Sequence, residues 1–412
     1  MSESRPHASQ LPPNPNLRHL KDQAKGHLRS GEAPSLALAL LQTARQYGFQ
    51  SWPKLKAHVL SQTLAGALKE AIDRDDLAEV RRLLSRNPEL RSAPIGYAGE
   101  GPLTWAAECR GLGQPSTERL GIVEWLISTG SDVHEGGDAP MMRASLSGSR
   151  IAMMELLVRH GADVNAAWHG SYPILFAPCE TLDPTSLSWL LQYGADPNCG
   201  TESQWQLHGK SHPGTALDYL LGTYVRSPSA LNQSVKLLQE AGGTSRYNEP
   251  GVLATVCGDS ETIDDLLRKD RSLLERRYPS LDIGTTAGRM LTLKGATLLH
   301  VAAEFGQPVV AQQLLDAGAD ADQTALIDAN GIGGQTPIFH AATQGGDNGI
   351  TVVRLLLERG ADLSVRCRLP GHYERLDEVF EGTVLDYARL FPESGNQAFE
   401  LLSRHRRVED QS

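Results

Sequence analysis

Cysteine is scarce in this chain of 412 residues, and its pattern excludes a covalent framework. The five cysteines (109, 179, 199, 257 and 367) are odd in number and scattered, with no C-x-x-C pair among them. Disulfide scaffolds and structural zinc sites both need paired, regularly spaced ligands, so we expect neither, and no cofactor of another kind. Long apolar runs are also missing, and no stretch approaches the roughly 20 residues that cross a bilayer. We therefore expect a cytoplasmic protein with no membrane partner.

Catalytic signatures are missing as well. The chain contains neither a G-x-S-x-G elbow nor an H-E-x-x-H helix, which removes two common hydrolytic sites. Residues 209–211 (GKS) resemble the end of a phosphate-binding loop, but position 204 is Gln where that loop needs Gly, and no apolar strand precedes it. We therefore expect a protein that is not an enzyme and has no catalytic residues.

Positive charge is sparse beyond the N-terminal region. Residues 1–60 hold 8 Lys and Arg against 3 Asp and Glu, a net charge of +5; because the whole chain carries −10, residues 61–412 carry −15. Nucleic acid is not an expected partner, because phosphate binding requires a basic surface. Arg18, Lys21, Lys25 and Arg29 could contact an anion, but a solvated helix face explains them equally well.

What the chain does have is a phrase that recurs at the end of apolar helical stretches. LLVRHGADVN ends at Asn165, LLQYGADPN at Asn198, LLDAGADAD at Asp322 and LLLERGADLS at Ser364, with a weaker copy, LISTGSDVH, ending at His134. Self-similarity at a period of some tens of residues means that one unit cannot bury its own apolar face and must stack on its neighbours. The pattern predicts a solenoid.

Each copy of this motif has the features of a helix end. A Leu pair closes the apolar stripe, and a Gly follows where the last turn must pass through a left-handed residue. Upstream lies a second helix start, best seen at 297–303 (TLLHVAA) and 336–342 (TPIFHAA), where Thr caps the free amides and the Ala pair allows close helix packing. The separation from that Thr to the closing Gly is 21 residues (297 to 318) or 24 (336 to 360), enough for two short antiparallel helices.

These two halves resemble the ankyrin repeat, whose consensus begins T-P-L-H-x-A-A and ends G-A-D-x-N. Weaker openings and closing Leu pairs extend the pattern to about nine helix-turn-helix units with finger loops, over roughly residues 61–405. The resemblance implies that His300 ties adjacent repeats through hydrogen bonds. It also implies that the aromatic residues one position after that His pack within the stack. These are Trp105, Phe176, Tyr219 and Tyr387.

Spacings longer than the family's unit of about 33 residues predict inserted loops. The candidates are residues 109–119, 199–213, 222–231, 281–295, 323–334 and 366–382. The unit that follows Gly242 and Gly243 lacks the usual opening and resembles the start of an array. We therefore expect one array over 61–243 and a second over 244–405, followed by a tail at 406–412, with a single continuous solenoid as the alternative.

The first 60 residues differ in kind. Residues 1–16 are polar and proline-rich, so we expect a disordered tail and neither a signal nor a transit peptide. Residues 17–60 predict a helical module, and its run YGFQSWPKLK resembles one that precedes many bacterial ankyrin arrays. Tyr47, Phe49, Trp52 and Leu55 offer a large apolar surface, so we expect this module to cap the open end of the solenoid.

The resemblance implies an all-α scaffold for protein–protein interaction, whose partners contact the finger before each Thr and the last turn of the first helix. Finger positions are Tyr97, Glu100, Asp138, Trp168, His169, His212, Lys294 and Gln335. Helix-end positions are Glu108, Glu180, Glu304, Phe305, Thr343 and Gln344. Carboxylates predominate among them and three aromatics are present, which indicates an acidic concave groove for a basic protein or peptide with apolar anchors.

The alternative is an enzyme, or an enzyme's regulatory subunit, whose site is built from the insertion at 199–213. His208 and His212 lie four residues apart with Cys199 upstream and Asp218 downstream. That histidine spacing suits a metal when it lies on a helix, but the intervening Gly and the following Pro predict a loop. A site would require these side chains to converge in a pocket.

Overall fold

The computed structural model describes residues 11, 15–61, 64–109, 113–146, 148–200, 206–207, 210–211, 214–285, 288–345, 348–375, 378–391 and 397–409. The chain divides into two compact units. The first comprises Met1–Ala144 and Ala152–Asp163, and the second comprises Ser145–Ile151 and Val164–Ser412. The predicted joint at Gly242 and Gly243 lies inside the second unit. No helix among the described residues is both long and apolar enough to span a membrane.

The first unit begins with three helices that share a small core. They are α1 (Leu17–Arg29), α2 (Leu36–Gln46) and α3 (Trp52–Ser61). Side chains of Asn16 and Ser35 accept hydrogen bonds from the amides of Arg18 and Leu38, and so cap the first two helices. Leu20, Ala44, Leu55 and Val59 form the core, against which Tyr47, Phe49 and Trp52 pack. These aromatic side chains therefore stabilise the helical module itself. That the module also caps the repeats remains a prediction.

The remaining helices of the first unit form antiparallel pairs. They are α4 (Leu64–Asp73), α5 (Leu77–Arg86), α6 (Pro102–Glu108), α7 (Thr117–Ser128), α8 (Ala139–Ser145) and α9 (Ile151–Arg159), with short 3₁₀ turns η1 (Pro88–Ser92) and η2 (Tyr97–Gly99). The division between units falls within the last helix pair. Apolar residues recur on one face of each helix, as Val80, Leu83 and Leu84 do in α5, and these faces supply the buried core.

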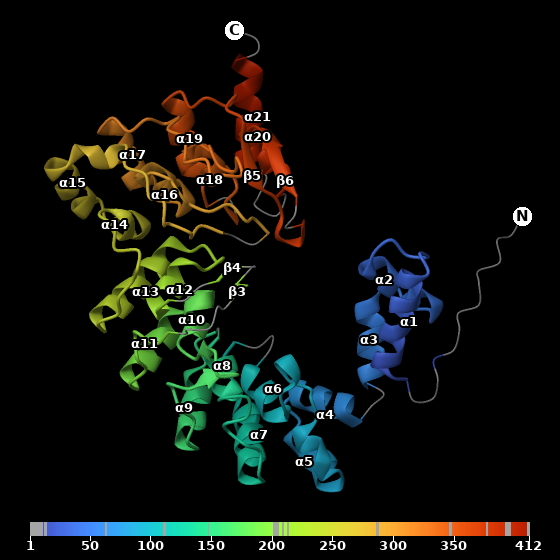
Figure 1. Cartoon of the computed structure of the whole chain (residues 1–412). Coiled ribbons are helices and arrows are strands. Elements are labelled where there is room, and N and C mark those ends of the chain that lie inside the picture. The colour runs from blue at the N-terminus through green and yellow to red at the C-terminus, as the bar shows by residue number, and fades with distance from the viewer. Residues whose placement is uncertain are drawn as a thin grey trace, which may run out of the picture. The chain divides into compact units, whose positions relative to one another are not determined.

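The second unit repeats the helix pair further (Figure 1). Its helices are α10 (Phe176–Thr181), α11 (Pro184–Gln192), α12 (Ala216–Leu221), α13 (Pro228–Glu240), α14 (Val252–Cys257), α15 (Ser260–Lys269), α16 (Leu298–Glu304), α17 (Pro308–Asp316), α18 (Pro337–Ala342), α19 (Ile350–Glu358), α20 (Val384–Ala388) and α21 (Gln397–Glu409). Two 3₁₀ turns, η3 (Arg271–Leu274) and η5 (Tyr373–Arg375), lie between them.

Strand is rare, and it lies in the connections between helices. The described residues contain three two-stranded antiparallel pairings. The strands are β1 (Ala167–Trp168) with β2 (Tyr172–Pro173), β3 (Gln206–Leu207) with β4 (Lys210–Ser211), and β5 (Cys367–Pro370) with β6 (Val379–Gly382). The chain is mostly helical, as expected, but finger hairpins add these short strands to the all-α prediction.

The helices end where the recurring G-A-D motif predicts. Gly161, Gly194, Gly318 and Gly360 have φ between +78° and +101°, the left-handed conformation that stops each helix. Asn198 then links one repeat to the next. Its Nδ2 donates to the Gly242 carbonyl oxygen at 2.9 Å, and its Oδ1 accepts a hydrogen bond from the Thr244 amide at 2.9 Å. Asn165 makes the same pair of bonds to the Gly194 carbonyl and the Asp196 amide.

The first helices also behave as the pattern predicts. His300 accepts from the amide and hydroxyl of Thr297 through Nδ1, and its Nε2–H donates to the Gln335 carbonyl of the next repeat at 3.0 Å. The predicted tie between repeats is thereby confirmed at this position. Burial lowers the pKa of His300 to about 3, so the ring is neutral at physiological pH. The four aromatic residues expected inside the stack are all buried.

Candidate protein-recognition surface

The inserted loops of the second unit join into one layer, here called the finger layer, formed by the described residues 278–285, 288–296, 324–335, 367–375 and 378–382. Backbone hydrogen bonds connect consecutive fingers: the Leu326 amide donates to the Gly295 carbonyl at 3.0 Å, and the Gly333 amide donates to the Arg368 carbonyl at 2.8 Å. The register of β5 and β6 then pairs Cys367 with Gly382. Three insertions predicted as separate loops therefore form a continuous surface.

The middle finger turns tightly because of two residues. Asp328 Oδ1 accepts the amides of Asn330 and Ile332 at 2.8 and 2.9 Å, which closes the turn at the tip. Gly333 has φ +127°, and a Cβ placed on it would lie 2.2 Å from the Leu326 carbonyl oxygen. Only glycine permits this close approach. The returning segment is thereby held against Leu326 and Ile327.

A cleft of about 330 Å³ opens between these fingers. Its lining is mainly apolar and includes Pro279, Leu291, Leu326, Ile327, Leu369 and Pro370. Leu326 and Ile327 are 45% and 64% exposed, which is unusual for such large aliphatic side chains. Lys294 and Asp328 are the charged residues of the lining. The cleft thus combines an apolar interior with a few polar groups, the composition typical of a binding site.

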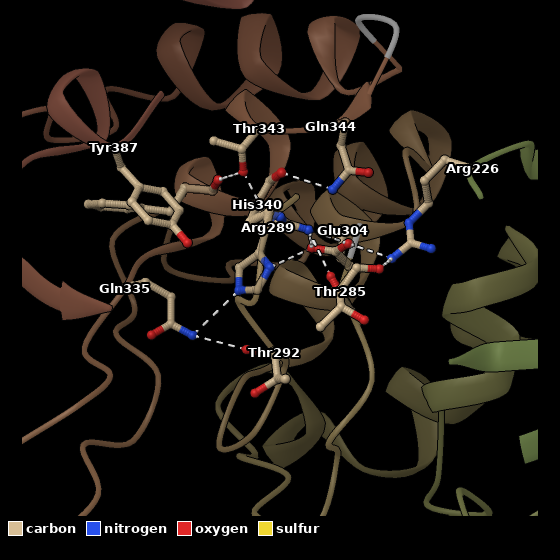
Figure 2. Close-up of polar contacts among 12 residues, drawn as sticks. Arg226, Thr285, Arg289, Thr292, Glu304, Gln335, His340, Thr343, Gln344 and Tyr387 are labelled. Atoms are coloured by element: carbon tan, nitrogen blue, oxygen red, sulfur yellow. Dashed lines mark hydrogen bonds and ion pairs between the residues drawn. The ribbon is translucent and has the colours of Figure 1, made fainter. Parts of the chain in front are cut away.

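Gln335 lies at the base of the cleft. It is 2% exposed, and its Nε2 donates to the Thr292 carbonyl at 3.3 Å and lies 3.5 Å from His340 Nε2. Figure 2 shows its Oε1 on the side away from His340. That oxygen is buried and has no hydrogen-bond partner among the described residues. A buried acceptor without a donor is uncommon and calls for an explanation.

Next to Gln335 lies a buried ionic network centred on Glu304 (Figure 2). Arg289 Nη2 lies 2.6 Å from Glu304 Oε2, Arg226 Nη2 lies 2.8 Å from Oε1, and His340 Nδ1 lies 2.7 Å from Oε2. Burial alone would raise the pKa of Glu304, but Arg289, the His340 hydrogen bond and Arg226 together hold it well below its usual value. The carboxylate is therefore ionised and fully paired.

The protonation of His340 follows from these contacts. Burial lowers the pKa of His340, against the opposing effect of its hydrogen bond to Glu304, so the ring is neutral at physiological pH. Because the ionised carboxylate accepts only, the proton lies on Nδ1 and leaves Nε2 as an acceptor facing Gln335. Both neighbours of Gln335 Nε2 are then acceptors, which fixes the orientation of the amide. The network thus contacts the cleft lining through Gln335.

A second carboxylate centre lies between the first helices of two earlier repeats. Glu180 Oε2 accepts from the hydroxyls of Tyr172 and Tyr219 at 2.8 and 3.0 Å, and Oε1 accepts from Tyr224 at 3.3 Å. Burial raises the pKa of both Tyr172 and Tyr219, so these phenols remain donors. Trp168 packs edge-on against Tyr172 with ring centroids 6.1 Å apart. Both oxygens of the Glu180 carboxylate therefore already accept hydrogen bonds from these three hydroxyls.

The structure distributes the predicted contact residues unevenly. Those on the surface are Tyr97, His169 and Lys294, whereas Trp168 and Glu180 are partly buried. Those in the interior are Glu100, Glu108, Asp138, Glu304, Phe305, Gln335, Thr343 and Gln344, none more than 8% exposed. His212 lies outside the described residues. The cleft brings together two predicted residues, Lys294 and Gln335.

The interior residues require a correction. Gln335 lines the cleft, but the other seven do not. A partner cannot contact side chains that the repeats themselves bury, so the assignment of these seven as direct contacts was wrong. The physical reason is pairing: Glu108 binds Arg143 at 2.6 Å, and Asp138 lies 3.0 Å from His134. Thr343 Oγ1 accepts from Arg289 at 3.1 Å, and Gln344 Nε2 donates to the His340 carbonyl at 3.0 Å. These groups hold repeats together.

Sequence reasoning missed the aliphatic residues of the cleft. Leu326, Ile327 and Leu369 lie in insertions, where no repeat period identifies an exposed position. One signal was present: Leu326 and Ile327 are adjacent aliphatic residues in a predicted loop otherwise rich in polar, alanine and glycine residues. Two adjacent aliphatic residues in a finger loop indicate a contact with a partner.

Two residues of the alternative enzyme site, Cys199 and Asp218, lie in the described part of the chain, and both have structural roles. Burial raises the pKa of Cys199 to about 12, so its sulfur is not a thiolate nucleophile at neutral pH. Asp218 accepts from the Ser245 hydroxyl at 2.6 Å and the Arg246 amide at 2.9 Å while capping α12. His208 and His212 lie outside the described residues. Within the described chain, no cluster of three His, Cys, Asp or Glu side chains could hold a metal.

Comparison with known proteins agrees with this architecture. Residues 252–367 match the family model for ankyrin repeats, in three copies. The chain is also 31% identical over 111 residues to an ankyrin repeat protein of fowlpox virus (strain NVSL), an alignment that covers 27% of this chain and 18% of the viral protein. The chain thus spans less than a fifth of that relative. Residues 252–367 are ankyrin repeats, which confirms the resemblance there. The bacterial type, the count of nine units and the cap remain predictions.

Proposed function

We propose that this protein is a non-catalytic scaffold that binds a partner protein through the finger layer of its second unit. Ankyrin repeats are generally protein–protein interaction modules, and three copies cover residues 252–367. The observation that carries the proposal is the cleft, where Leu326 and Ile327 are exposed beside an apolar interior. Exposed aliphatic side chains grouped at a cavity indicate an interaction site.

An acidic groove for a basic partner is less well supported. That expectation rested on Glu108, Glu180 and Glu304. The first and last are paired with arginines inside the repeats, and the other accepts three tyrosine hydroxyls. Carboxylates paired with arginine generate little field for long-range attraction of a cation, and the oxygens of Glu180 already accept hydrogen bonds inside the repeats. We therefore assign recognition to the apolar cleft.

Two matched substitutions test this proposal. Ile327 in the cleft and Val309 on α17 are both 64% exposed aliphatic residues of the same unit. Full-length Ile327→Asp and Val309→Asp proteins would be used, beside the wild type, to capture partners from native extract, with the captured proteins quantified by mass spectrometry. We expect Ile327→Asp to lose at least tenfold of a partner that Val309→Asp retains, because burying a charge in an apolar contact is costly. Equal capture by both variants would reject the cleft.

A further inference from the structure

We propose that the cleft binds an extended peptide segment of the partner in which an aliphatic side chain stands beside an Asp or Glu. The aliphatic side chain fills the cleft, and the carboxylate pairs with Lys294. This inference rests on the proposed function and specifies its ligand.

The apolar requirement follows from the cleft interior. Leu291, Leu326 and Leu369 line a volume of about 330 Å³, and Ile327 stands exposed at the same site. A polar side chain entering there would lose water without finding partners on these walls. An aliphatic or aromatic side chain would instead remove apolar surface from water on both molecules.

The charge requirement follows from which charged groups are already occupied. Asp328 is bound to the amides of its own turn. Arg368 donates to the Asn330 carbonyl at 3.4 Å, and Arg277 to the Thr324 carbonyl at 3.0 Å. Lys294 lines the cleft, is exposed, and has no hydrogen-bond or ion-pair partner among the described residues. Of the two charged residues that line the cleft, Asp328 is held within its own turn, whereas the ammonium group of Lys294 is available to pair with a carboxylate.

The extended backbone is suggested by Gln335. Its Nε2 is held by the Thr292 carbonyl, and its buried Oε1 lacks a donor at the base of the cleft. A peptide carries one N–H donor per residue, so a segment that enters the cleft brings the missing group. Peptide binding would thus remove an unsatisfied acceptor that the unbound protein contains.

Synthetic peptides test the inference on the full-length protein. Fluorescence polarisation would compare alanine-based octapeptides with a central Leu whose neighbour is Glu, Gln or Lys, each with a free or an amidated C-terminus. We expect the Glu peptide to bind about two- to fivefold tighter than the Gln peptide, the range of an exposed ion pair, and the Lys peptide to bind worst. Amidation should leave this order unchanged, whereas a preference lost on amidation would assign the contact to a terminal carboxylate and overturn the inference.

Charge reversal supplies the decisive arm. Lys294→Glu should reverse the order so that the Lys peptide binds best, and Lys236→Glu, an exposed lysine on α13, should leave the order unchanged. An unchanged order in Lys294→Glu would overturn the inference. So would failure of all peptides to bind a protein that still captures its partner in an Ile327-dependent manner. That last result would leave the proposed function standing, because it shows that the cleft recognises something other than a linear segment.

Discussion

Arg289 and Glu304 form a fully buried ion pair, with Nη2 and Oε2 2.6 Å apart and both side chains 0% exposed. Glu304 is the last residue of α16, whereas Arg289 comes from the inserted segment that precedes this helix. Arg226, which follows α12, and His340 of α18 contact the same carboxylate. One carboxylate thus joins the insertions that supply Arg226 and Arg289 to helices α16 and α18 of the second unit, next to Gln335 of the cleft lining.

Removing the central charge should destabilise the second unit. Glu304→Gln leaves two buried guanidinium groups without their counter-ion, and breaking a buried ion pair typically costs about 3–5 kcal/mol. Urea unfolding followed by circular dichroism should show a lower midpoint. Glu400→Gln, at an exposed pair with Arg404, is the control and should unfold like the wild type. Equal midpoints for Glu304→Gln and Glu400→Gln would mean that the network contributes little to stability.

Stability should fall as the solution is acidified. His300 has its pKa lowered from 6.5 to about 3, and the pKa of His340 is lowered too, so the unfolded chain binds protons that the folded chain does not. For His300 the loss should begin below pH 6.5 and continue toward about pH 3, at up to about 1.4 kcal/mol per pH unit, and His340 adds to the loss below pH 6.5. The lowered pKa of Glu304 adds to the loss below pH 4.5, because the unfolded carboxylate is protonated first.

His300→Gln isolates one contribution to this pH dependence. The amide offers an acceptor and a donor but does not titrate, so the free energy of unfolding should depend less steeply on pH between about 6.5 and 3. His19→Gln alters an exposed histidine of α1 and serves as the control. A slope that His300→Gln leaves as steep as in the wild type would show that His300 is not held neutral by burial.

Asp322 offers a stabilising substitution. Asn165 and Asn198 each make two hydrogen bonds to the next repeat, but Asp322 at the same place in the phrase can only accept, from the Asp362 amide at 2.8 Å. Burial and the nearby carboxylates of Asp320 and Asp362 raise its pKa. Asp322→Asn adds a donor and removes repulsion, so it should raise the free energy of unfolding by about 0.5–1.5 kcal/mol. Asn198→Asp should change it in the opposite direction, and a destabilised Asp322→Asn would contradict this interpretation.

The N-terminal module gives a prediction about solubility. The sequence predicts that residues 17–60 cap the first repeats, and the structure gives this segment a core of its own around Leu20 and Leu55. Deleting residues 1–60 should lower the melting temperature of the remaining chain and promote its aggregation, because a solenoid with an uncovered end exposes apolar surface. Differential scanning fluorimetry and light scattering measure both effects. A truncated protein that melts and scatters like the full chain would show that the module has another role.

The repeated elements were predictable because they obey a period. Gly318 and Gly360 mark helix ends by conformational necessity, and Thr297 with His300 forms the cap that the pattern indicates. The same period predicted where loops are inserted, since a spacing longer than one unit leaves residues that no helix can use. At these residues the sequence therefore predicts the place of each residue within its repeat.

The candidate site was not predictable in the same way. Glu304 occupies a helix end, where the period alone leaves its side chain open to a partner. It is buried because Arg226 and Arg289 reach it from the insertions at 222–231 and 281–295. The path of an insertion depends on contacts between segments far apart in the chain, as in the hydrogen bond from Leu326 to Gly295, and these follow no local rule.

Site-specific photo-cross-linking measures directly whether the finger-layer cleft contacts the partner. Benzoylphenylalanine would replace Ile327 in one protein and Val309 in another, since both positions are equally exposed at 64%. After irradiation in native extract, we predict a cross-linked adduct of defined mass at position 327 and none of that mass at position 309. An adduct at 309 alone, or the same adduct at both positions, would show that the cleft is not the specific contact with the partner.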